Sequence, residues 1–368
     1  MFRVQEDSAE LDARCRPRKN CPRLTLMAEA KIQRIRSEIA LIKQNIGKEE
    51  AMHRILTRNR TIRFLGLGLA SFLIAAPAQA QDDQELNLQG AFDFHVHQAP
   101  DSVPRTIDAD DLARLAKSKG MRGMIMKNHW EETGSLVYMV RKLVPGIEIY
   151  GGVTQDLAVG GMNLEAVKHM VAMKGGYGRV VWLPTYDAEN AVKKGRTPNA
   201  PFVAVSKDGK LVPSVLELMD FIKAHPQMVL ETGHISAEEV LMVTHEAHER
   251  GLPHVVVTHA MFNPVSMNVD QMKQAARDGA YLEFVYNATF GNRPGTNSVD
   301  DYAKAIRAVG PEHCIVATDY GNVTDPPRGF EPDALLAFMQ GLHKGGLTVA
   351  EINQMVKVNP LLALGLKP

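Results

Sequence analysis

Residues 91–126 read AFDFHVHQAPDSVPRTIDADDLARLAKSKGMRGMIM. The apolar segment 91–97 predicts a buried strand, and the segment 123–126 predicts a second one. Between them, residues 108–120 have Asp108 as a helix N-cap, apolar residues at helical spacing and a glycine as the stop signal. A strand, a helix and another strand in this order indicate two parallel strands joined by a crossover helix.

The same alternation continues to the end of the chain. Further strands are predicted at 147–154, 179–184, 228–234, 254–260, 281–287 and 314–321. Further helices are predicted at 135–144, 164–175, 215–225, 236–251, 268–279, 299–309, 333–344 and 348–357. One interruption, FVAVSKDGKLV (202–212), contains an Asp-Gly pair that is typical of a hairpin turn.

Eight strands, each followed by helix, predict a protein of the α/β class with one (β/α)8 TIM barrel, a fold of about 250 residues. An open, doubly wound sheet is the alternative. That fold usually has a glycine-rich phosphate loop after its first strand, whereas this chain has HVHQAPDS there. We therefore expect the barrel.

Composition limits the classes of partner. The chain has 368 residues, 45% of them hydrophobic, with 42 basic and 42 acidic side chains, as in ordinary globular proteins. A net charge of zero gives no electrostatic reason to expect binding to nucleic acid or to an anionic membrane. We expect a small molecule as the partner, and the sequence leaves a homo-oligomer open.

The segment before the barrel has the order of an export signal. Within 52–80, four arginines precede the apolar run 64–76, and Ala78 and Ala80 then occupy the small-residue positions of a cleavage site. This order predicts cleavage after Ala80 and a secreted or periplasmic protein. A membrane anchor is the alternative, but the apolar run is shorter than the about 20 residues that a membrane span needs.

The expected division of the chain has three parts. Residues 1–51 are interpreted as an upstream extension that arises from the assigned start, 52–80 as the signal peptide and 81–368 as the barrel domain. Two of the three cysteines fall in the extension, so the barrel keeps only Cys314. A single cysteine forms no disulfide within the chain, and stability must come from the hydrophobic core.

Residues of the metal-ligand type stand at the predicted strand ends. His95 and His97 end the first strand, and their spacing of two places both side chains on one face. Later strand ends carry His234, His259 and Asp319. The carboxyl ends of the strands form one rim of a barrel, so we expect these five side chains to converge. Imidazole and carboxylate ligands suit zinc, iron, manganese or cobalt.

Five other residues are candidates for roles around this site, three of them with two interpretations each. Lys127 and His129 follow the second strand and belong either to the site or to a solvated loop. Asp101 and Arg105 follow the first strand closely, and we expect them to contact substrate. Glu283 lies in the middle of a strand, where it is either part of the core or a support for a metal ligand.

The ligand order resembles that of the amidohydrolase superfamily across the whole of 81–368: H-x-H on strand one, His on strands five and six, and Asp on strand eight. ATDYG (317–321) and NPLLALGL (359–366) resemble the branch that contains metal-dependent decarboxylases and hydrolases. HVHQAPDSVPR (95–105) and KNHWEETG (127–134) are most similar to a poorly characterised amidohydrolase-like family.

The resemblance implies roles for the ligands. His95, His97, His234, His259 and Asp319 would hold a divalent transition metal, with Zn²⁺ as the first choice, and Asp319 would also exchange a proton with the attacking water. Binuclear members carry a bridging Lys or Glu after strand four, where this chain has VVWLPTYD (180–187). We therefore expect one metal ion, or two if Lys127 bridges them; otherwise Lys127 would hold the substrate.

The expected function is metal-assisted hydrolysis of an amide, cyclic amide, lactone or ester. The metal would bring the pKa of a water molecule towards about 7, and Asp319 would accept its proton. Lys127 or His129 would meet the developing oxyanion. Two alternatives stay open: a metal-dependent decarboxylase or other lyase at the same site, and a secreted binding protein that has lost turnover.

Overall fold

The computed structural model describes residues 85–195, 199–290, 296–324 and 330–368. The predicted extension 1–51 and signal segment 52–80 lie outside these residues. In the part that is described, no helix is long and apolar enough to span a membrane.

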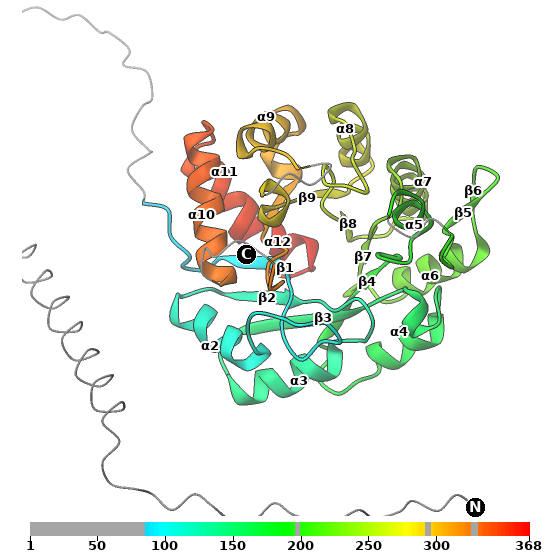
Figure 1. The fold of residues 1–368 in the computed structure, drawn as a ribbon, viewed down its shortest axis with the longest axis horizontal. Helices are drawn as coiled ribbons and strands as arrows, with labels where there is room; N and C mark the ends of the chain where they lie inside the picture. Colours follow the sequence, from blue (N-terminus) through cyan, green and yellow to red (C-terminus); the bar gives the residue numbers. More distant parts are fainter. Residues whose placement is uncertain (1–84, 196–198, 291–295, 325–329) are drawn as a thin grey trace, which may run out of the picture. The chain divides into compact units, whose positions relative to one another are not determined.

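Eight parallel strands form the barrel in the order β1-β2-β3-β4-β7-β8-β9-β10 (Figure 1). Their bounds are β1 (Phe92–Val96), β2 (Gly123–Met126), β3 (Glu148–Thr154), β4 (Gly178–Trp182), β7 (Val229–Glu231), β8 (Val255–Val257), β9 (Tyr281–Val285) and β10 (Cys314–Ala317). Each of them lies within a segment predicted as strand, or within one residue of it. The expected α/β barrel is confirmed.

The barrel closes between its first and last strands. Val96 pairs with Tyr320 in a parallel bridge. The backbone N–H of His97 donates to the carbonyl of Tyr320 at 2.8 Å, and that of Asp319 donates to the carbonyl of His95 at 2.8 Å. Closure therefore joins the two segments that carry the H-x-H pair and the strand-eight aspartate.

Helices surround the strands, as Figure 1 shows. They are α2 (Ala109–Ser118), α3 (Gly134–Leu143), α4 (Leu164–Val171), α6 (Pro213–Lys223), α7 (Ala237–Arg250), α8 (Val269–Arg277), α9 (Val299–Val309), α10 (Glu331–Lys344), α11 (Val349–Asn353) and α12 (Asn359–Ala363). Each long helix buries one apolar stripe against the strands; in α2 the stripe includes Leu112 and Ala116. The core therefore lies inside the barrel and between its strands and helices.

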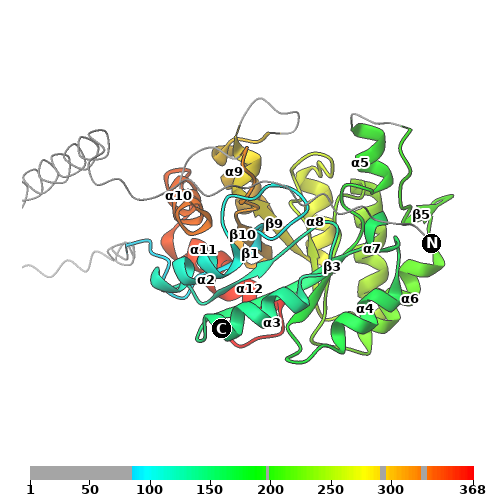
Figure 2. The ribbon, with the colours of Figure 1, turned by 60° about the horizontal axis from the view of Figure 1, so that its bottom comes forward.

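A short helix follows β4, and the interruption 202–212 then forms a hairpin (Figure 2). Helix α5 (Glu189–Lys194) was not predicted from the sequence. Strands β5 (Ser206–Lys207) and β6 (Lys210–Leu211) pair antiparallel. The Asp-Gly pair between them has φ angles of 51° and 73°, which confirms the predicted turn.

Two local predictions need correction. Helix α4 ends at Val171 rather than at 175. The predicted helix 348–357 is α11 followed by a π turn at Gln354–Val358 and then α12; Pro360 lacks the N–H that a regular helix would use there. The prediction of Asp108 as the N-cap of α2 is confirmed, although its side chain makes no capping hydrogen bond.

Candidate metal centre and active-site pocket

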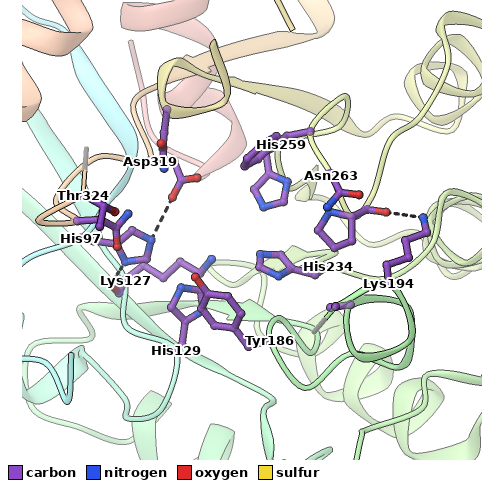
Figure 3. Close-up of a pocket in the computed structure, with 16 residues that line it drawn as sticks. His97, Lys127, His129, Tyr186, Lys194, His234, His259, Asn263, Asp319 and Thr324 are labelled. Atoms are coloured by element: carbon purple, nitrogen blue, oxygen red, sulfur yellow. Dashed lines mark hydrogen bonds and ion pairs between the residues drawn. The ribbon is translucent and has the colours of Figure 1, made fainter. Parts of the chain in front are cut away.

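Three of the predicted ligands meet at the closing seam of the barrel. His95 lies in β1, His97 follows it, and Asp319 follows β10. Oδ1 of Asp319 lies 3.3 Å from Nε2 of His95. It also lies 3.1 Å from Nε2 of His97, a contact that Figure 3 shows. The possible ligand atoms of the three residues all lie within 4.8 Å of one another, the distance range of a shared metal ion.

The backbone bends sharply to present the aspartate. Asp319 has a φ of 51°, which is uncommon for a residue other than glycine. The preceding residue secures the bend, because the backbone N–H and the hydroxyl of Thr318 donate to Asp93 at 3.0 and 2.7 Å. Complete burial raises the pKa of Asp93 to about 7. Backbone strain at this position indicates a functional constraint.

Hydrogen bonds on the far side of each imidazole fix where its proton resides. Nδ1 of His97 donates to the carbonyl of Lys127 at 2.8 Å, because a carbonyl oxygen only accepts. Nδ1 of His95 faces Oε2 of Glu283 at 3.2 Å. A neutral ring in either position therefore carries its proton on Nδ1 and directs the lone pair of Nε2 towards Asp319.

The charges of the three residues are compatible with a bound cation. Burial lowers the pKa of His97 to about 4, so this ring is neutral at physiological pH. Burial alone would raise the pKa of Asp319, but His95 and His97 together hold it well below its ordinary value. Burial and Lys127 oppose protonation of His95, yet Asp319 and Glu283 outweigh them and raise its pKa. Two imidazole nitrogens and a carboxylate oxygen that converge in this way fit a divalent transition metal, to which His95 would bind in its neutral form.

His234 and His259 line the same pocket but do not join this group of ligand atoms. Their rings lie 4.8 Å apart, and the ring of His259 is stacked 6.3 Å from that of His95. Nδ1 of His259 is buried and has no hydrogen-bond partner among the described residues. Burial lowers the pKa of His259 to about 4 and that of His234 well below its ordinary value, which keeps both rings neutral.

Glu283 supports two of the histidines. Besides Nδ1 of His95, its Oε2 accepts the backbone N–H of His259 at 2.9 Å. It is fully buried in β9. The sequence left Glu283 either as part of the core or as a support for a metal ligand. Its contacts with His95 and His259 agree with the second interpretation.

Lys127 and His129 are buried, so the solvated-loop interpretation is wrong for both. Nζ of Lys127 lies 3.2 Å from Nε2 of His95 and 5.4 Å from the ring centroid of Trp182. Burial lowers the pKa of Lys127, although Asp319 and other carboxylates oppose the shift. Both side chains line the pocket.

Asp101 and Arg105 pair with each other. Nη2 and Nε of Arg105 lie 2.6 and 2.7 Å from Oδ2 of Asp101, and both side chains are buried. Arg105 also donates to Oδ1 of Asn322. Of these three residues, only Asn322 lines the pocket. Substrate contact by Asp101 and Arg105 stays a prediction, while the observed contacts show them positioning a pocket residue.

The pocket has a volume of about 360 Å³ and lies at the carboxyl ends of the strands. Residues not singled out from the sequence also line it: Tyr186, Lys194, Phe262, Asn263, Asn287 and Asn322. Asn287 comes soon after β9, a position that could have indicated it. Lys194 comes from α5, which no sequence pattern predicted.

The fold and the site define a (β/α)8 barrel with a candidate metal centre at its carboxyl-terminal rim. The sequence matches the family of unknown function DUF6282 over residues 90–283, more than half of the chain, and the protein belongs to this family. A search of curated proteins found no match.

Solved structures share the barrel. An amidohydrolase from Pseudomonas aeruginosa superposes with a TM-score of 0.50 and 14% identity over 75% of this chain and 95% of its own. The probable dipeptidase PvdM from the same organism gives 0.51 and 11% over 75% and 94%. A metallo peptidase from Rhodobacter sphaeroides, bound to a phosphinate mimic of L-Ala-D-Ala, gives 0.51 and 12% over 76% and 99%. At these identities the likeness establishes the fold.

Proposed function

We propose that this protein is a metal-dependent hydrolase that holds one divalent transition metal, with Zn²⁺ as the first choice, between His95, His97 and Asp319. The observation that carries the proposal is that one possible ligand atom from each of the three residues lies within 4.8 Å of the others, with Oδ1 of Asp319 close to both Nε2 atoms. When bound, such an ion supplies Lewis-acid chemistry, which polarises a carbonyl group and activates water. His234 and His259 stand beside the centre as further candidate ligands.

Side chains of the pocket would carry out proton transfer and hold the substrate. The carboxylate of Asp319 lies beside both histidines, where it would accept the proton of the attacking water and deliver it to the leaving group. Lys127 and His129 line the same pocket and would face the substrate and the oxyanion that develops on it. Amides, cyclic amides, lactones and esters are the candidate small-molecule substrates.

We expect the purified protein to contain about one transition metal per chain. Elemental analysis measures the metal content, and a substrate screen with and without a chelator connects it to activity. The exposed His245 on α7 provides a control, since His245→Ala should change neither. Two tightly held metal ions per chain would indicate that Lys127 bridges them. A protein that takes up no metal on loading would refute the proposal, and release of carbon dioxide without water consumption would indicate a lyase.

We also propose that the protein is exported and cut after Ala80, on the basis of the charged, apolar and small-residue order in 52–80. We expect the N-terminal sequence of the mature protein to begin at Gln81. An uncut chain beginning at Met1 and retained in the cytoplasm would contradict this proposal.

A further inference from the structure

A chain of buried hydrogen bonds connects Asp156, through Thr185, to His129 in the pocket. His129 follows β2, Asp156 follows β3 and Thr185 follows β4. Nδ1 of His129 lies 2.8 Å from Oγ1 of Thr185, whose hydroxyl donates to Oδ2 of Asp156. All three residues are buried.

The direction of each hydrogen bond follows from the donors available. Oδ1 of Asp156 accepts the backbone N–H groups of Thr185 at 2.7 Å and of Asp187 at 3.2 Å. Its Oδ2 takes the only hydroxyl hydrogen of Thr185. Burial raises the pKa of Asp156 to about 6, so this carboxylate is still ionised at neutral pH. Oγ1 of Thr185 must then accept from His129, which places the imidazole proton on Nδ1.

Nε2 of His129 is consequently a bare acceptor in the pocket wall. The ring lies 5.0 Å from that of His97 and 4.4 Å from that of Tyr186, and Figure 3 shows it among the pocket side chains. No hydrogen bond among the described residues reaches this nitrogen. An acceptor in the wall of a pocket, with no protein donor beside it, favours a ligand that brings its own donor.

We propose that Asp156 and Thr185 hold His129 as a hydrogen-bond acceptor that selects substrates with an N–H beside the scissile carbonyl: secondary or cyclic amides rather than the corresponding esters and lactones. The inference rests on the proposed hydrolase function for its substrate class. A site built to accept a hydrogen bond from a substrate discriminates strongly against an analogue that lacks the donor, because its own acceptor is then left unpaired.

The test compares Thr185→Val, which removes the hydroxyl at nearly constant volume, with Thr185→Ser, which retains it. The probes are N-acylglycines and the matching O-acylglycolates, which differ only in N–H against O. We expect Thr185→Val to lower the ratio of kcat/KM for amide over ester by about 10- to 100-fold, the effect of one buried hydrogen bond. Thr185→Ser should keep the ratio within about threefold of the parent value. Equal ratios in the parent and Thr185→Val would overturn the proposal.

A second readout needs no turnover. Nitrogen-15 NMR of the metal-loaded protein, with the resonances assigned by their absence in His129→Gln, should show protonated Nδ1 and bare Nε2 in the parent and in Thr185→Ser. N-acylglycine should shift the Nε2 resonance, whereas O-acylglycolate should not. A proton on Nε2, equal shifts with both probes, or a second metal ion lost on His129→Gln would each overturn the inference. A protein that hydrolyses neither probe but gives the expected spectra would contradict the proposed function alone.

Discussion

Asp319→Asn should lower turnover by about 10²- to 10⁴-fold, the usual contribution of a general base, while the protein retains most of its metal. The asparagine keeps an oxygen that is able to coordinate a metal ion. Its amide does not accept a proton at neutral pH, so the attacking water loses its proton acceptor. Steady-state kinetics and elemental analysis on the same preparation measure the two properties separately.

His95→Ala is the informative contrast to Asp319→Asn. It removes a ligand nitrogen and also leaves Glu283 without one of its partners, so metal content and activity should fall together. Near-normal turnover in Asp319→Asn with metal bound would show that Asp319 is not the base, and the hydrolytic mechanism proposed for this site would then be wrong.

Gly321→Ala should destabilise the fold by about 4 kcal/mol or more, which places it among the most damaging single substitutions. Gly321 has a φ of 120°, and a Cβ built there would lie 1.9 Å from the backbone carbonyl oxygen of His97. The added methyl group would force β1 and β10 apart at the seam where His97 meets Asp319. We expect the unfolding temperature to fall by about 10 °C, together with a loss of metal.

Gly251→Ala is a control that separates the steric clash with His97 from the cost of a positive φ angle. Gly251 also has a positive φ, 72°, but a Cβ at this C-cap of α7 would meet no atom within 4 Å. Only the conformational cost should remain, about 1 kcal/mol. Thermal unfolding of both variants provides the comparison. Equal losses of stability would show that contact with His97 does not explain the requirement for glycine at 321.

The sequence determined the architecture because its signals are local. Apolar strand segments and amphipathic helices alternate along the chain, and the eight predicted strands correspond to the eight strands of the barrel. Helix α9 has the predicted bounds, Val299–Val309, because a serine cap and a glycine stop enclose it. The H-x-H spacing placed His95 and His97 together for the same reason, since strand periodicity is a property of neighbouring residues.

The tertiary structure alone decided which of these residues meet. Asp319 lies beside His97 although 222 positions separate them, and Glu283 reaches His95 across 188. The sequence alone allows Lys127 to be a solvated loop residue. In the closed barrel its side chain is buried, with Nζ beside His95. The pairing of Arg105 with Asp101 and the path from Asp156 to His129 likewise depend on side-chain directions. Local patterns specify which face a residue occupies, whereas contacts across the barrel follow only from its closure, which joins β1 to β10.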